Sequence, residues 1–153
     1  MHRERILFST EELEIKMAVI DMQTMRYINL LDKASHVKTH TCFVYNNTIM
    51  FVVPRSMVSK ALGPDALNVR RIQEELGKKI RIVAAPEGKS DLHEFISKVV
   101  APLGFKSVEV RGEECIINAG SQHKAALIGR NRRRQEELQS VVKDLFSLEL
   151  KIL

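Results

Sequence analysis

The chain has 153 residues, of which 44% are hydrophobic and 28% are charged. This length suits one domain or two small ones, and the apolar content excludes a chain that is disordered throughout. The longest uninterrupted apolar run, 49–53, has five residues, whereas a membrane helix needs about 20. The first residues include too few apolar positions for a signal peptide, so we expect a cytoplasmic protein without a membrane partner.

The positive charge of the chain is concentrated in one segment. Lys and Arg number 24 and Asp and Glu 19, which gives a formal net charge of +5. The window 115–135 holds five basic residues and no acidic one, and the rest of the chain holds 19 of each sign. Such a window favours an anion-facing surface, with a solvated helix face as the alternative.

The first predicted elements are a long helix and a hairpin. Helical spacing of apolar residues predicts a helix over 10–32, with a capping box at Ser9–Glu12. The β-branched and aromatic runs 41–45 and 48–53 predict two strands. They flank Asn46-Asn47, and because Asn tolerates positive φ angles, this pair suits a two-residue hairpin turn.

Two helices and a strand are predicted next. A short helix over 56–62 is cut by Gly63-Pro64, and proline suits the first position of the helix that follows. Gly77 closes that helix with a left-handed cap, and alternation over 79–84 predicts a strand. The order of the first half is therefore αββααβ.

The second half repeats this order after a turn-rich linker at 86–90. Its predicted elements are a helix from Ser90 or Asp91 to Pro102, strands over 106–110 and 114–118, helices over 121–128 and 131–146, and a strand over 148–152.

An internal repeat relates the two halves. A shift of 66 positions places Gly63 on Gly129, and it places apolar residues on apolar residues elsewhere, as with Phe51 and Ile117. We therefore expect an α+β fold of two αββααβ units, 1–85 and 86–153. Each unit should bury one sheet face beneath three helices, and the short linker should hold the two as one packed unit.

The candidate phosphate-binding site of each copy is at the glycine between its second and third helices. This glycine brings the end of one helix close to the start of the next, whose leading amides are unpaired and suit a phosphate. The first of these loops reads Gly63-Pro64-Asp65-Ala66, and the second reads Gly129-Arg130-Asn131-Arg132.

Three segments carry a resemblance to a known family: 59–83, 91–102 and 126–134. With them the chain resembles a tandem of KH domains of the prokaryotic type, and in particular the short archaeal NusA-like transcription factors. The resemblance implies binding of single-stranded RNA by loops that clamp the nucleotide backbone. It also implies a role in transcription elongation or termination, with RNA polymerase as a further partner.

Both loops depart from the GxxG pattern of KH domains, because neither has the second glycine. In the first, Pro64 removes an amide donor and Asp65 adds a negative charge where a phosphate would lie. We therefore expect the second loop to bind RNA and the first to be auxiliary. The predicted RNA-binding residues are Lys124, Ile128, Gly129, Arg130, Asn131, Arg132, Arg133 and Arg134, followed by Lys60, Gly63 and Asn68.

Other kinds of site find little support in the sequence. Cys42 and Cys115 lie far apart without CxxC spacing, and His36, His40 and Cys42 fit no zinc pattern, so we expect no metal site and no cofactor. No nucleophile elbow or P-loop is present, so we expect no enzyme. We also expect a monomer. The alternative function is a protein-binding scaffold with degenerate KH loops that contacts RNA polymerase or the ribosome.

Overall fold

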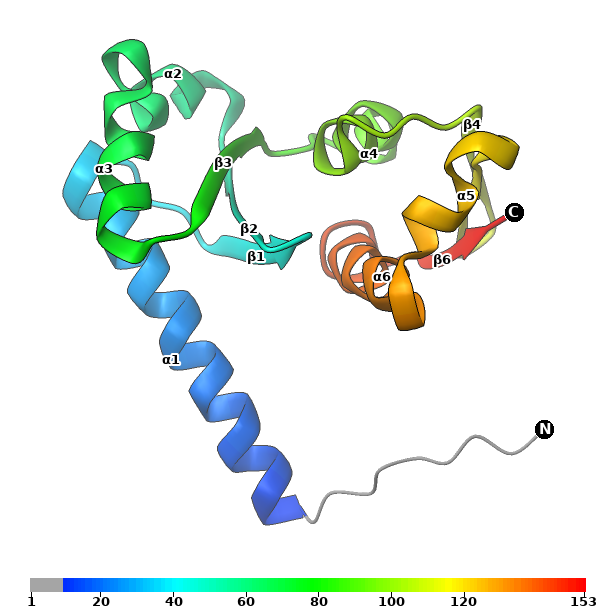
Figure 1. The fold of residues 1–153 in the computed structure, drawn as a ribbon, viewed down its shortest axis with the longest axis horizontal. Coiled ribbons are helices and arrows are strands. Elements are labelled where there is room, and N and C mark those ends of the chain that lie inside the picture. Colours follow the sequence, from blue (N-terminus) through cyan, green and yellow to red (C-terminus); the bar gives the residue numbers. More distant parts are fainter. Residues whose placement is uncertain (1–9) are drawn as a thin grey trace.

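The computed structural model of the protein describes residues 10–153, with the side chains of that range except 12–21 (Figure 1). The capping box predicted at Ser9–Glu12 lies outside the described residues. No helix in the described range is long and apolar enough to cross a membrane.

The N-terminal half follows the predicted αββααβ order. The N-terminal part of its first helix, α1, extends away from the rest of the molecule as an arm, and the C-terminal part packs beside α3 (Figure 1). The elements are α1 (Thr10–Ser35), β1 (Thr41–Tyr45), β2 (Thr48–Val53), the 3-10 turn η1 (Arg55–Met57), α2 (Val58–Leu62), the turn η2 (Pro64–Ala66), α3 (Leu67–Leu76) and β3 (Lys79–Ala84).

The C-terminal half, residues 86–153, repeats the order. Its long helix begins at Arg133 rather than at the predicted position 131, because the two residues before Arg133 have left-handed backbone angles. The elements are the turn η3 (Lys89–Asp91), α4 (Leu92–Val100), β4 (Ser107–Arg111), β5 (Glu114–Asn118), α5 (Gly120–Ile128), the turn η4 (Arg130–Arg132), α6 (Arg133–Phe146) and β6 (Glu149–Ile152).

The strands form two separate three-stranded sheets with the same topology. In the first sheet β1 pairs antiparallel with β2, and β2 pairs parallel with β3. In the second, β4 pairs antiparallel with β5, and β5 pairs parallel with β6. The fold class is therefore α+β, as predicted, and the arrangement is compatible with KH-like domains.

One face of the first sheet packs against the helices of its own half. Ile49, Phe51 and Val53 alternate along β2 toward this face, and they form a buried cluster with Leu31 of α1 and Ile72 of α3. Amphipathic helices and alternating strands bury their apolar faces against each other in this way.

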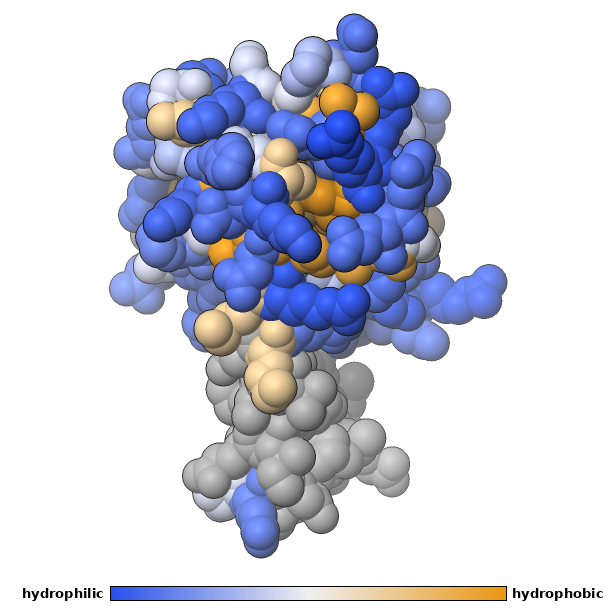
Figure 2. Space-filling model, turned by 90° about the vertical axis from the view of Figure 1, so that its left-hand side faces the viewer, coloured by the Kyte–Doolittle hydropathy of each residue, from blue (hydrophilic) through white to orange (hydrophobic). Residues whose placement is uncertain are grey.

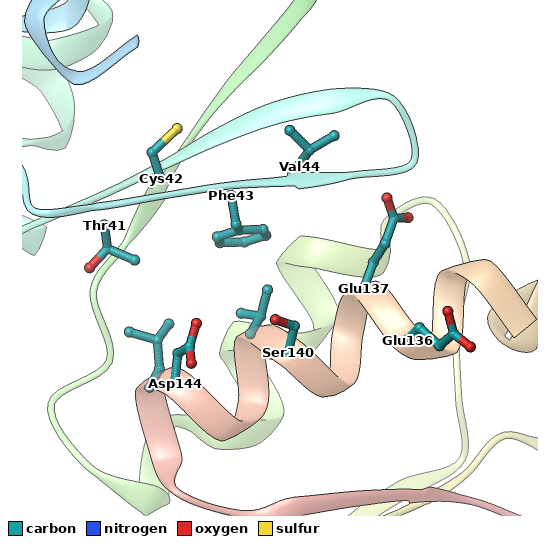
Figure 3. A pocket seen from close by; sticks show the side chains of 10 residues that line it. Thr41, Cys42, Phe43, Val44, Glu136, Glu137, Ser140 and Asp144 are labelled. Atoms are coloured by element: carbon teal, nitrogen blue, oxygen red, sulfur yellow. The ribbon is translucent and has the colours of Figure 1, made fainter. Parts of the chain in front are cut away.

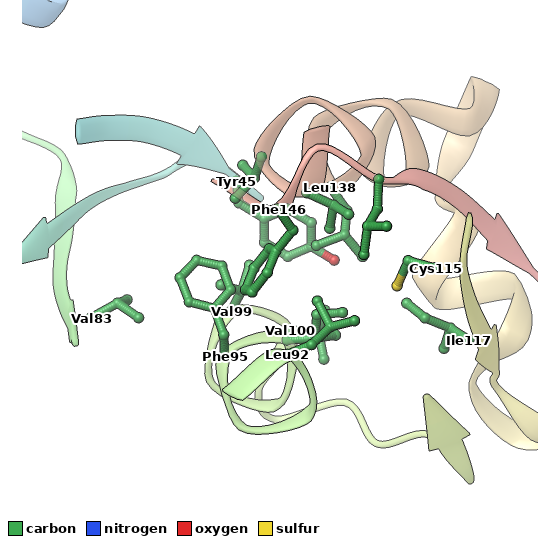
Figure 4. Close-up of a cluster of buried hydrophobic side chains, with 14 of the residues drawn as sticks. Tyr45, Val83, Leu92, Phe95, Val99, Val100, Cys115, Ile117, Leu138 and Phe146 are labelled. Atoms are coloured by element: carbon green, nitrogen blue, oxygen red, sulfur yellow. The ribbon is translucent and has the colours of Figure 1, made fainter. Parts of the chain in front are cut away.

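The other face of the first sheet is also buried, although one buried face per sheet is predicted. Helices α4 and α6 lie between the two sheets, and their apolar side chains contact both (Figures 1 and 4). Met50 and Val83 reach this cluster from the first sheet, and Cys115 and Ile117 reach it from the second. All six residues of β2 are buried as a result. The expectation of one buried face per sheet is therefore wrong for the first sheet.

Candidate nucleic-acid interface

The loop 129–132 turns the chain between α5 and α6 through a left-handed backbone. Gly129 has φ 77° and ψ 171°, and Asn131 and Arg132 follow with φ of 56° and 59°. The amide of Gly129 donates to the carbonyl of Ala125, and the amide of Arg132 donates to that of Gly129. These bonds end α5 and close the turn just before α6 begins.

The loop 63–66 of the N-terminal half has the same backbone in spite of its different sequence. Gly63 has φ 76° and ψ 174°, and Asp65 and Ala66 have φ of 52° and 56°. The two loops therefore follow the same path, although neither has glycine at its fourth position. Ala66 and Arg132 instead adopt positive φ angles that glycine accepts more easily.

Three arginines of the second loop are free to meet an anion. Arg130, Arg132 and Arg133 are exposed, and among the described residues none of them has an ion-pair partner. They gather where α6 begins, at the positive end of the helix dipole. This arrangement suits a phosphate, because side-chain charge and the helix dipole act at one place.

Arg134 differs from its neighbours because it is already paired. Its Nη1 lies 2.8 Å from Oε1 of Glu137, and both side chains are largely buried. The same carboxylate oxygen accepts the backbone N–H of Asn46 at 3.2 Å. Glu137 thus links the arginine loop to the β1–β2 hairpin, and Arg134 holds this link rather than offering a free charge.

A groove of about 660 Å³ lies beside the arginine loop, with walls from both halves of the chain. Arg130, Asn131 and Arg133 line it from the second half, and the hairpin residues Tyr45 and Asn46 line it from the first. The remaining lining residues are Val100, Pro102, Leu103, Ala126, Gly129 and Arg134.

The Tyr45 hydroxyl is buried at the edge of this groove without a hydrogen-bond partner among the described residues. Burial raises the pKa of this hydroxyl, while the positive charge of Arg134 acts in the opposite direction. The hydroxyl therefore stays neutral and carries the cost of an unmade hydrogen bond.

The other predicted site residues take different places. Lys124 is exposed on α5, and Ile128 is half-buried at its end. In the N-terminal half Lys60 is exposed, while Nδ2 of Asn68 donates to the carbonyl of Lys60 at 3.1 Å and so caps the end of α2. Gly63 begins the loop between them. The face that carries α2 and α3 is mainly hydrophilic (Figure 2).

Residues of the groove that sequence reasoning missed come from distant parts of the chain. Tyr45 and Asn46 carry no RNA-binding motif, and they meet the loop only because the hairpin packs against α6. The described residues contain no group of three or more His, Cys, Asp or Glu side chains placed to hold a metal.

Comparison with known structures defines the fold of this α+β chain. The solved crystal structure of APE1850 superposes with a TM-score of 0.62 at 24% identity, over 86% of this chain and 99% of that one. At 24% identity this match shows the fold alone. No family model matches the sequence.

Comparison with curated proteins confirms the predicted resemblance to archaeal NusA-like proteins. The chain is 25% identical over 120 residues to the probable transcription termination protein NusA of Methanocaldococcus jannaschii. It is 26% identical over 86 residues to the protein of the same name from Halococcus morrhuae, and 28% over 107 residues to that of Methanococcus vannielii. The matches cover 76%, 56% and 70% of this chain and 64%, 60% and 53% of those proteins.

Proposed function

We propose that this protein is a non-enzymatic transcription factor that binds single-stranded RNA at the arginine loop 129–132. In this proposal residues 1–85 and 86–153 are two KH domains, and the second makes the main RNA contact. The similarity to proteins named probable transcription termination protein NusA supports a role in transcription termination. The proposal extends this role to elongation and includes RNA polymerase as a further partner.

The proposal rests on the exposure and the ion pairing of the arginines at the loop. Arg130, Arg132 and Arg133 are exposed and unpaired within the described residues, whereas Arg134 is held by Glu137. Three free guanidinium groups at the start of a helix suit consecutive phosphates of a flexible strand. The groove beside them offers apolar surface from Ala126 and Leu103 for the bases.

The N-terminal loop is assigned an auxiliary role. It has the same backbone path as the arginine loop. However, Asp65 is exposed there, and Pro64 has no backbone N–H to donate to a phosphate. A phosphate at this position would be repelled by the carboxylate.

A charge-reversal experiment tests the proposal. Fluorescence anisotropy with labelled oligomers of the four homopolymer RNAs would compare Arg130→Asp/Arg132→Asp with Lys60→Asp/Arg71→Asp, which changes the net charge equally. We expect the first variant to lose at least about tenfold in affinity, and the second to lose much less, because phosphate contacts dominate such binding. The reverse order would move the site to the N-terminal half.

Salt dependence provides a second readout. The logarithm of the affinity should fall with the logarithm of salt concentration at a slope of about 0.7 per phosphate contacted, and the arginine variant should show a smaller slope. A salt-insensitive complex would argue against phosphate recognition. If polymerase is still captured from a lysate after ribonuclease treatment, the scaffold alternative gains support.

A further inference from the structure

Strand β1 is an edge strand with unused hydrogen-bonding groups. The first sheet has the order β1-β2-β3, so one edge of β1 faces no other strand. Tyr45 and Thr48 flank the two-residue turn and form a hydrogen-bonded pair, after which bonded and non-bonded pairs alternate. The N–H and C=O groups of Cys42 and Val44 therefore point away from β2.

The exposed edge of β1 has no other partner within the described residues. Outside the β1–β2 ladder, none of the hydrogen bonds found there uses the backbone of Cys42 or Val44. Val44 is 43% exposed, so this end of the strand is accessible. An edge of this kind is a template for pairing with another extended chain.

A groove runs along this edge, between β1 and α6. It has a volume of about 350 Å³ and is lined on one side by Thr41–Val44. The other side is formed by α6, and Phe43 points from the strand toward that helix (Figure 3). Phe43 with Val141 and Leu145 gives the groove an apolar floor.

The outer wall of the groove is acidic, although the chain as a whole is positive. Glu136, Ser140 and Asp144 follow each other at four-residue spacing on α6, and all three are exposed. Neither Glu136 nor Asp144 has an ion-pair partner within the part of the chain that the structure describes. This charge disfavours RNA and favours a partner with Lys or Arg side chains.

The spacing of these acidic side chains fits an added strand. Asp144 lies at the Thr41 end of β1, and Glu136 and Glu137 lie toward its Val44 end (Figure 3). Glu136 and Asp144 are eight positions apart on α6, which corresponds to about 12 Å along the helix axis. Residues four apart on a strand are separated by about 13 Å, and their side chains point to the same face.

We propose that the groove between β1 and α6 binds an extended polypeptide segment with two basic residues four positions apart, which adds to the first sheet as a fourth strand. Backbone bonds to Cys42 and Val44 hold the segment, and Glu136 and Asp144 select its basic side chains. This is the strand-addition mode of peptide recognition. The groove shares no lining residue with the groove beside the arginine loop, although Glu137 pairs with Arg134 and so joins the two. In this proposal the segment binds independently of RNA.

Two synthetic peptides of equal composition test the proposal. Both have blocked ends: one is Thr-Lys-Val-Ser-Val-Lys-Thr, and the control, Thr-Val-Lys-Ser-Lys-Val-Thr, places its lysines only two positions apart. In nuclear magnetic resonance titrations of the full chain, the first peptide should bind at least about tenfold more tightly and should shift the amides of Cys42 and Val44 most. Equal affinities, no binding at millimolar peptide, or shifts centred on Gly129 would each overturn the proposal.

Variants separate the backbone contacts from the charge contacts. Val44→Pro removes an N–H that the sheet does not use, and proline is tolerated on such an edge. This variant should lose at least about tenfold in peptide affinity, whereas Val44→Thr, which keeps the N–H, should bind like the original chain. Glu136→Lys/Asp144→Lys, on an exposed helix face, should lose binding without loss of folding. Unchanged binding by Val44→Pro, with folding verified by circular dichroism, would overturn the strand-addition mode.

Two further measurements separate this proposal from others. Saturating single-stranded RNA should leave the peptide affinity unchanged, whereas competition would place both ligands on one surface and overturn an independent site. Sedimentation of the chain without peptide should show no dimer that depends on the β1 edge. A dimer of that kind would form in the original chain and be absent in Val44→Pro. Such a dimer would assign the β1 edge to a second copy of the chain.

Discussion

Asn68 and Arg134 occupy the same place in the two halves, 66 positions apart, and each lies against the glycine five residues before it. A Cβ added at Gly63 would lie 2.7 Å from Nδ2 of Asn68, and one added at Gly129 would lie 2.6 Å from Cγ of Arg134. The two side chains then make different bonds. Asn68 caps a helix within its own half, whereas Arg134 pairs with Glu137, which also holds the other half's hairpin.

Alanine at either glycine should destabilise the protein. Gly63 and Gly129 combine φ near 76° with ψ near 174°, a region that essentially only glycine occupies. Backbone atoms also come within 3.2 Å and 3.0 Å of the added Cβ. We expect Gly63→Ala and Gly129→Ala each to lower the free energy of unfolding by about 1–3 kcal/mol in urea denaturation.

Gly88→Ala is the matched control for these variants, because Gly88 has an extended backbone and no atom within 4 Å of an added Cβ. It should change the free energy of unfolding little. If Gly129→Ala proved as stable as Gly88→Ala, the tight turn before α6 would not exist in solution.

Glycine at the fourth loop position should stabilise the protein. Ala66 and Arg132 hold φ of 56° and 59°, and a left-handed angle costs an L-residue about 1–2 kcal/mol. Ala66→Gly and Arg132→Gly should therefore raise the free energy of unfolding by about 1 kcal/mol. The control Ala126→Gly, inside α5, should lower it by about the same amount.

Arg132→Gly should also separate stability from RNA binding. It removes one of the three free guanidinium groups of the loop, so RNA affinity should fall while stability rises. A rise in both quantities would mean that the backbone of the loop, rather than the Arg132 charge, limits RNA binding.

Replacing Tyr45 by Phe should be tolerated. The Tyr45 hydroxyl is buried and has no hydrogen-bond partner within the described residues, so its removal relieves a desolvation cost. We expect Tyr45→Phe to leave the free energy of unfolding unchanged or to raise it by about 1 kcal/mol. A loss of more than about 1 kcal/mol in thermal or urea unfolding would show that the hydroxyl is satisfied in solution.

The two thiols should make stability depend on pH in the alkaline range. Burial raises the pKa of Cys42 from 9.0 to about 12 and that of Cys115 from 9.0 to about 11. Below pH 9 both thiols are protonated in the folded and unfolded chains, so the full stability is present. Above pH 9 the unfolded chain releases protons first, so stability falls as the pH rises toward 11 and 12.

Lys and Tyr side chains also titrate in this alkaline range. The loss of stability must therefore be compared between the original chain and a variant without the two thiols. Urea unfolding at pH 8 and pH 10 would compare the original chain with Cys42→Ala/Cys115→Ala. The original chain should lose more stability between the two pH values than the variant does. Equal losses would mean that the thiols are accessible to solvent in the folded protein.

Much of the local structure could be predicted from the sequence. Strands β1, β2, β3 and β5 begin and end at the predicted residues, because alternation and the Asn46-Asn47 turn are local signals. The apolar pattern predicts the start of α6 two residues early, because nothing in the local pattern marks Asn131 and Arg132 as left-handed. The sequence pattern also groups Arg134 with the free arginines, although its i,i+3 spacing to Glu137 on α6 is a local signal of an ion pair.

The sequence by itself determined the αββααβ repeat, the shared glycine of the two loops and the segment that holds the excess positive charge. The apolar run 49–53 is typical of a strand buried on both faces, but it does not say what covers the second face. Only the tertiary structure decided that α4 and α6 cover it. That packing forms both grooves, and it depends on contacts between residues far apart in the chain, which leave no periodic signal in either half.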